Sequence, residues 1–179
     1  MGEGEKVAKD YIKQMECYRL FSSDMNDAFH GLKMLRKYKR GDIRYCLIQM
    51  VVVSYARPFS SNKVLGEQKK GRYDLKKEIH VPQALWSFHE EVIEMRNQVF
   101  AHTDHSFRKP KIANWSNDEQ GMFFPMVARG FYYDTVNKKV PEISTLIEAV
   151  NNNLNAEITR LQERACKEGY KGPNALPLT

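Results

Sequence analysis

The first forty residues keep one apolar register from end to end. Apolar side chains recur every three or four positions, which places them on a single face of an α-helix. The polar run from Ser22 to Asp24 does not shift this register. The pattern predicts one long helix that ends at Gly41 and buries its apolar face against other elements. The stripe consists of Tyr11, Met15, Tyr18, Phe21, Met25, Phe29, Leu32 and Leu35.

A second helix is predicted directly after this one. Asp42 is a suitable N-cap, and the helix runs to about Ala56. Pro58 ends it and disfavours helical geometry at Arg57, the residue before the proline. Residues 59–80 contain two glycines and many lysines, so we expect a loop with at most a short helix.

Two more helices complete the expected bundle. Pro82 lies near the first turn of a helix that reaches Ala101 or His102, and Pro141 opens a last long helix. Residues 107–138 carry aromatic residues and turn signals, which favours a short β-hairpin or an irregular aromatic insertion. We therefore predict one all-α domain, a four- to five-helix bundle with this insertion before its last long helix and a frayed tail over residues 170–179.

Length and composition agree with one folded domain. The chain has 179 residues, 42% of them hydrophobic, and lacks the run of about 18 apolar residues that a membrane span needs. Its first residues have no apolar core of the kind that a secretory signal requires. Cys17, Cys46 and Cys166 are far apart, which favours free thiols over disulfides or a zinc site. We expect a cytoplasmic protein without membrane contact.

Positive charge is concentrated in one part of the chain. Residues 33–77 contain thirteen Lys and Arg against three acidic residues, a net charge of +10. The whole chain has a net charge of +6, so the remainder carries −4. A concentrated positive surface attracts polyanions such as RNA, although lysine-rich loops also occur simply as soluble surface.

Residues 94–105 hold the densest group of chemically capable side chains. They read Glu-Met-Arg-Asn-Gln-Val-Phe-Ala-His-Thr-Asp-His. Arg96 and His102 are six positions apart, about 9 Å of rise and about 240° of rotation on an ideal helix. They converge if the helix end is distorted, or if a second copy of the chain supplies the missing partner.

Arg96, Asn97 and His102 resemble the R-x4-6-H signature of the HEPN superfamily, in which a polar residue, often Asn, follows the Arg. The Phe-Ala-His-x-Asp around His102 is similar to the abortive-infection, or phage-defence, branch of that superfamily. The resemblance implies a HEPN-like bundle that cleaves RNA as a homodimer, without a metal ion or cofactor. It also implies a toxin or effector role, with an antitoxin or another protein as partner.

The residue types fit this chemistry. Histidine can accept and donate protons near neutral pH, and an Arg can hold a phosphate and offset its developing charge. Asn97 can orient the phosphate or the imidazole. One such His per chain is one short of an acid–base pair, and a two-fold dimer supplies the second copy.

Four further residues are candidates for supporting or substrate-binding positions. Asp104 and His105 follow the motif, and Tyr55 and Arg57 lie at the end of the second predicted helix. The aromatic residues of the insertion can stack on bases or close a small core of their own. They are Phe123, Phe124, Tyr132 and Tyr133.

Plainer interpretations of the same residues remain open. Arg96 can form a surface ion pair with Glu94, and His102 at a helix C-terminus gains about 0.3–1 kcal/mol from the helix dipole. The bundle can then be a catalytically inactive module that binds RNA, a nucleotide or a protein. A metal site built from His102, Asp104 and His105, with His80 or His89, matches no known ligand spacing, so none is predicted.

Overall fold

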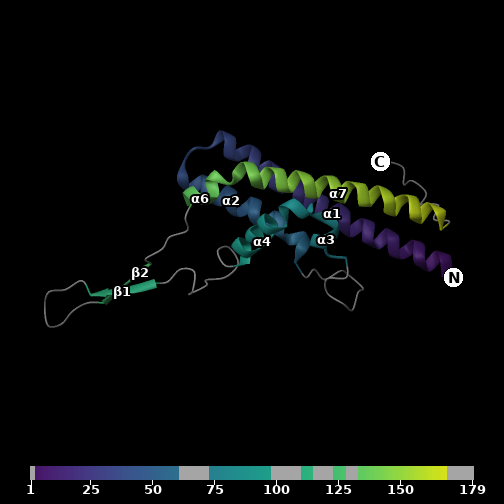
Figure 1. Cartoon of the computed structure of the whole chain (residues 1–179), viewed down its shortest axis with the longest axis horizontal. Helices are drawn as coiled ribbons and strands as arrows, with labels where there is room; N and C mark the ends of the chain where they lie inside the picture. The colour runs from purple at the N-terminus through teal and green to yellow at the C-terminus, as the bar shows by residue number, and fades with distance from the viewer. Residues whose placement is uncertain (1–2, 61–72, 98–109, 115–122, 128–132, 169–179) are drawn as a thin grey trace, which may run out of the picture.

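The computed structural model describes residues 3–60, 73–97, 110–114, 123–127 and 133–168, and helices dominate them (Figure 1). The predicted all-α bundle is confirmed. The helices are α1 (Glu3–Lys37), α2 (Gly41–Ala56), α3 (Lys77–His80), α4 (Trp86–Met95), α6 (Tyr133–Lys138) and α7 (Val140–Lys167), with 3-10 turns η1 (Arg57–Phe59) and η2 (Gln83–Leu85).

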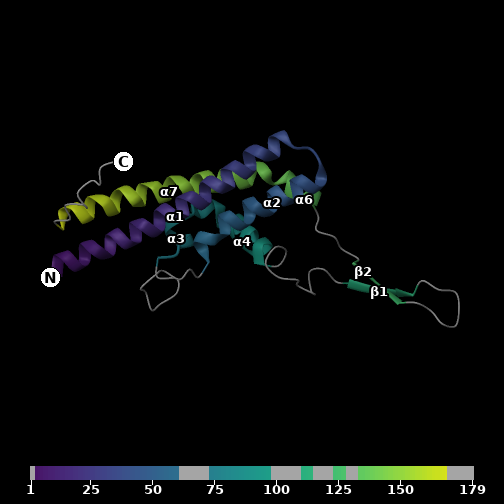
Figure 2. The ribbon, with the colours of Figure 1, turned by 180° about the vertical axis from the view of Figure 1, so that it is seen from behind.

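The expected insertion contains a β-hairpin. Strand β1 (Pro110–Asn114) pairs antiparallel with β2 (Phe123–Val127), and Ile112 lies opposite Pro125. Figures 1 and 2 place the hairpin beyond one end of the bundle. The short helix α6 falls inside the segment that the sequence assigned to the insertion, so the insertion ends earlier than residue 138.

Helices α1, α2 and α7 form the main core. Both views show α1 beside α7, with the start of α1 and the end of α7 at the same end of the bundle (Figures 1 and 2). All eight buried residues of α7 are apolar. They recur at helical spacing, which places them along one face of the helix. They are Ile143, Leu146, Ile147, Val150, Leu154, Ile158, Leu161 and Ala165.

Gly31 marks the close approach of α1 to α2. A Cβ at this position would lie 2.6 Å from Cγ2 of Val51 and 3.5 Å from the Leu47 carbonyl oxygen. Valine is stiff at χ1, so it cannot easily rotate out of the way. The absence of a side chain at Gly31 therefore sets how closely the two helices pack.

Two local predictions at the ends of α2 are wrong. The helix begins at Gly41, so Asp42 lies in its first turn and does not cap it. Both carboxylate oxygens of Asp42 instead accept hydrogen bonds from Arg40, at 3.2 and 2.6 Å. Arg57 keeps helical geometry, with φ −54° and ψ −49°, and the chain continues into η1. The buried Pro58 lies within this 3-10 turn, whose packing overrides the usual bias of a residue before proline.

Helix α4 packs on this core as a shorter outer layer. It follows η2, whose N-cap is Pro82, so the third predicted helix begins with a 3-10 turn. Its buried residues are His89 and Val92, while Leu85, Phe88 and Met95 are partly buried against the core. Among the described residues, no helix combines the length and apolar character needed to cross a membrane.

Candidate functional site

Arg96 and Asn97 lie at the C-terminal end of α4. Asn97 is exposed and Arg96 is half-buried. The Arg96 guanidinium donates a hydrogen bond from Nη1 to Oδ1 of Asn97, at 2.8 Å. Within the described part of the chain, Arg96 forms no ion pair, so the alternative of an Arg96–Glu94 surface pair finds no support there.

This end of α4 departs from ideal helix geometry. Arg96 and Asn97 form a π-helical turn, and the backbone N–H of Arg96 is shared between the carbonyls of Ile93 and Val92. A π-helical turn is wider than an α-helical one and is frequent at functional sites. A distorted helix end is the condition under which the sequence predicts that Arg96 and His102 converge.

Several predicted site residues lie outside the described residues. His102, Asp104 and His105 belong to residues 98–109, and Tyr132 to residues 128–132. The side chains of Phe123, Phe124 and Tyr133 are likewise outside the description, although their backbones belong to β2 and α6. The structure therefore places Arg96 and Asn97 and leaves their relation to His102 as a prediction.

Tyr55 lies in the core beneath α4. The side chain is fully buried, and its hydroxyl is 2.7 Å from Nδ1 of His89. Phe59 packs against the same imidazole in a T-shaped contact, with ring centroids 4.5 Å apart. Burial raises the pKa of Tyr55, so its phenol stays protonated. Tyr55 therefore contacts α4 through His89.

His89 is 5% exposed, and its ring is uncharged at neutral pH. Burial, followed by the positive charge of Lys77, lowers the pKa of His89 to about 4. The described partner of the buried Tyr55 hydroxyl is Nδ1 of His89, so the hydroxyl proton is satisfied when it points at Nδ1. In that arrangement Nδ1 accepts the hydrogen bond and the ring proton of His89 is on Nε2.

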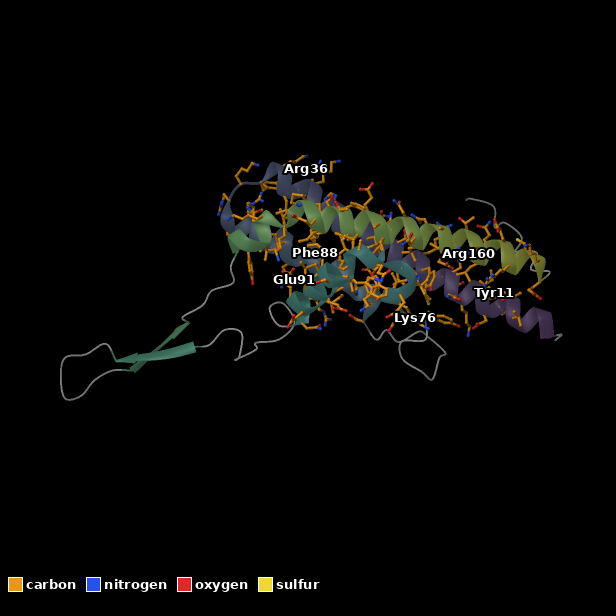
Figure 3. All side chains as sticks on the ribbon, viewed as in Figure 1. Tyr11, Arg36, Lys76, Phe88, Glu91 and Arg160 are labelled. Carbon is orange, nitrogen blue, oxygen red and sulfur yellow. The ribbon has the colours of Figure 1, made fainter. Side chains whose placement is uncertain are left out.

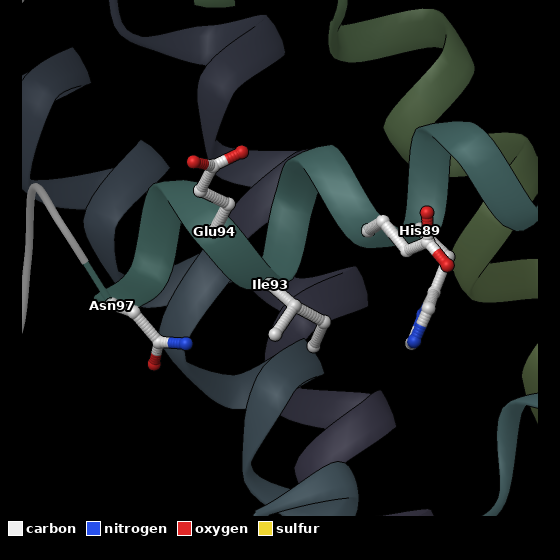
Figure 4. Close-up of a pocket in the computed structure, with 5 residues that line it drawn as sticks. His89, Ile93, Glu94 and Asn97 are labelled. Atoms are coloured by element: carbon white, nitrogen blue, oxygen red, sulfur yellow. The ribbon is translucent and has the colours of Figure 1, made fainter.

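A surface pocket of about 390 Å³ runs along α4 from His89 to Asn97 (Figure 4). The described residues that line it are His89, Glu90, Ile93, Glu94 and Asn97. Glu90 is held by an ion pair with Lys77, which lowers the pKa of its carboxyl group. The pocket thus joins the Arg96–Asn97 pair to the buried His89–Tyr55 pair, which the sequence did not single out as a unit.

Arg57 forms an ion pair with Asp24 of α1 and does not merely face solvent. Its Nη1 donates to Oδ1 of Asp24 on α1, at 3.1 Å, with the Arg57 side chain 54% exposed. This contact ties the end of α2 to the middle of α1. Arg57 is not among the described residues that line the pocket on α4.

The described residues of the basic segment do not all lie in one place, and residues 61–72 of that segment lie outside the description. Lys77 packs over the Trp86 ring, with Nζ 4.9 Å from the ring centroid, and pairs with Glu90 at the pocket. Arg36 lies on another side of the bundle from Glu91 of α4 (Figure 3). The last turns of α1 and the turn that leads into α2 expose Lys33, Arg36, Lys37, Lys39 and Arg40. Part of the basic segment therefore adjoins α4, and the exposed turn does not.

Metal ligands and thiols offer no alternative centre in the described part of the chain. No group of three or more His, Cys, Asp or Glu residues there is arranged to hold a metal ion. None of the three cysteines forms a disulfide, and Cys17 is buried while Cys46 and Cys166 are exposed.

The fold and the α4 site together define an all-α bundle with a polar, π-distorted helix end. Comparisons with protein-family models, curated proteins and solved structures find no significant match to this chain. The HEPN resemblance therefore depends on the residues of the motif itself.

Proposed function

We propose that this protein is a metal-independent endoribonuclease of HEPN type, with Arg96, Asn97 and His102 as its catalytic residues. The observation that carries the proposal is the position of Arg96 and Asn97, which lie together in a π-helical turn beside an open pocket. A guanidinium that forms no ion pair among the described residues is available to a phosphate. The resemblance of residues 94–105 to the superfamily's signature supplies the role of His102.

The reaction uses the RNA's own nucleophile. One His102 takes the proton of a ribose 2′-OH, and the 2′ oxygen attacks the adjacent phosphorus. The bond from phosphorus to the 5′ oxygen breaks, and this oxygen takes a proton from a second imidazole. The products are a 2′,3′-cyclic phosphate and a free 5′-OH. Arg96 stabilises the charge that grows on the non-bridging oxygens.

The proposal includes a homodimer, because the acid and the base are then the His102 side chains of two copies. Positive charge at Lys77 and at the exposed turn between α1 and α2 would draw RNA to the bundle. A toxin or effector role in phage defence, held in check by an antitoxin in the cytoplasm, follows from the same resemblance.

The test incubates the protein with single-stranded and structured RNA in EDTA. We expect cleavage that leaves 2′,3′-cyclic phosphate ends and falls at least about 100-fold in His102→Ala and in Arg96→Ala. His30→Ala is the matched control, because His30 is an exposed histidine on α1. Cleavage that survives the loss of His102, or that requires a metal ion, contradicts the proposal. A monomer by light scattering at micromolar concentration contradicts the shared site.

A second candidate is a catalytically inactive bundle of the same kind that binds RNA, a nucleotide or a protein partner. The exposed basic turn between α1 and α2 favours it, because this surface lies on another side of the bundle from α4. Salt-dependent RNA binding without cleavage would support this candidate over the enzyme.

A further inference from the structure

The imidazole of His89 is held by contacts on its core side, and its other side faces the pocket. Tyr55 holds Nδ1 from the core side, and Phe59 packs against the ring. No hydrogen bond of Nε2 is found among the described residues, and this atom is not one of the buried atoms left without a partner. Since His89 lines the pocket, Nε2 presents its N–H to whatever occupies it.

The polar groups of this pocket include both donors and acceptors. His89 offers an N–H, Asn97 an amide, and Glu90 and Glu94 carboxylate oxygens, while Ile93 offers an apolar surface. The volume of about 390 Å³ falls within the range of about 300–1,000 Å³ that small-molecule sites occupy. The two carboxylates disfavour a phosphate in the middle of the pocket. A flat, uncharged ligand with both donors and acceptors fits these groups better.

We propose that the pocket binds a nucleobase that carries an exocyclic amine beside a ring acceptor, as adenine and cytosine do. The Nε2–H of His89 donates to the ring acceptor, and a rim carboxylate accepts from the amine. This inference rests on the proposed function, because RNA is the source of the base.

The length of the pocket fits a nucleotide. His89 and Asn97 are eight residues apart, about 12 Å along an α-helix. A base at the His89 end leaves the sugar and phosphate toward Asn97 and Arg96, where the proposed chemistry occurs. His89 is then a specificity residue, and Tyr55 is a positioning residue that acts through it.

The experiment is an NMR titration of protein labelled with ¹³C at histidine Cε1, in the full chain. Adenosine and purine riboside, the same nucleoside without the exocyclic amine, are the probes, because nucleosides lack the phosphate that Arg96 would bind. We expect a saturable shift of the His89 signal with adenosine, and binding of purine riboside weaker by about fivefold, the effect of one lost hydrogen bond. The signal of His30, exposed on α1, should not move.

The matched variant is the double change Tyr55→Phe with His89→Phe. It removes both partners of one buried hydrogen bond, so neither group is left unpaired. We expect it to lose the preference for amine-bearing bases, and His89→Gln, which keeps a donor, to retain part of it. The affinity of the variants is measured by calorimetry, because the double variant has no His89 signal. An unchanged preference for the amine-bearing nucleoside in the double variant, or no His89 shift in the natural chain at millimolar nucleoside, overturns the inference.

The two proposals fail separately. If nucleosides shift the His89 signal but RNA is not cleaved, the endoribonuclease is wrong and the base site stands. If RNA is cleaved, but the double variant cleaves it with unchanged base preference, the base site is wrong and the endoribonuclease stands.

Discussion

The interface of α1 with α7 and the layer that α4 adds to the bundle are built on different principles. Every fully buried residue of α7 is apolar, from Ile143 to Ala165. The buried residues of α4 are one histidine and one valine, His89 and Val92. An apolar interface stabilises without specifying chemistry, whereas a buried hydrogen-bonded histidine costs desolvation and fixes an orientation.

The same contrast continues in α3, beside α4. His80 is 1% exposed, and its Nε2 is a buried atom without a hydrogen-bond partner in the described structure. Its ring meets Tyr18 of α1 in a T-shaped contact, with centroids 5.6 Å apart. Most of the stability therefore lies between α1, α2 and α7, and the polar positions that can carry function lie in the layer added to them.

The largest expected effect is in the apolar interface. Leu154→Ala on α7 removes a side chain with no exposed surface, and we expect it to lower the free energy of unfolding by about 2–5 kcal/mol. Leu20→Ala is the control, because Leu20 on α1 is 69% exposed, and it should change stability by less than about 0.5 kcal/mol. Urea unfolding measures both. Equal losses in the two variants would contradict the assignment of the core.

Acid should destabilise the protein through the α3 and α4 layer. The pKa of His89 is lowered to about 4, and burial also lowers that of His80, against about 6.5 in an unfolded chain. Between pH 6.5 and 4 these histidines therefore bind protons in the unfolded state but not in the folded state, so stability falls as pH falls. For His89 alone this loss reaches at most about 3 kcal/mol at pH 4.

The measurement is the urea midpoint between pH 7 and pH 4.5. In the double variant Tyr55→Phe with His89→Phe, stability should depend less steeply on pH, with a slope smaller by up to one proton. His80 is still present in this variant and should account for part of the remaining slope. The same slope in the double variant and in the natural chain would mean that His89 is not the group that resists protonation.

A cycle of variants tests the buried pair itself. His89→Phe alone leaves the Tyr55 hydroxyl buried without its described partner, and we expect a loss of about 1–3 kcal/mol. The double change with Tyr55→Phe should recover much of this loss, because no polar group is then left unpaired. Additive losses would show that the two side chains are not coupled, and would remove the basis for a fixed Nε2–H.

The apolar interface was predictable from the sequence, because it depends on a repeated pattern. Spacing at three and four positions predicted α1, although this helix ends at Lys37 and Gly41, its predicted end, begins α2. Pro141 was placed correctly in the first turn of α7. Such a signal is summed over many residues, so one polar residue such as Asp24 within α1 does not erase it.

The site was predictable only in part, because single contacts decide it. Neither the π-helical turn at Arg96 nor the hydrogen bond between Tyr55 and His89 follows from a repeated pattern in the sequence. One signal was available: His89 stands four residues after Leu85 and three before Val92, on the apolar face of α4. A histidine in that register is expected to be buried, and a buried histidine needs a partner. The predicted N-cap at Asp42 was wrong for a similar reason, because its carboxylate accepts hydrogen bonds from the Arg40 side chain.

The smallest expected effect concerns how α4 is attached to α7. Glu91 pairs with Lys139, just before α7, and both side chains are partly exposed, 44% and 32%. An ion pair of this kind contributes about 0–1 kcal/mol, so Glu91→Gln should cost less than about 1 kcal/mol in urea unfolding. The difference from the natural chain should shrink as salt is added, because exposed charges are screened. Glu157→Gln, in the Arg160–Glu157 pair within α7, is the matched control with no second helix to hold. A larger loss for Glu91→Gln that persists in high salt would mean that α4 is attached by charge as well as by packing, and the contrast with α7 would narrow.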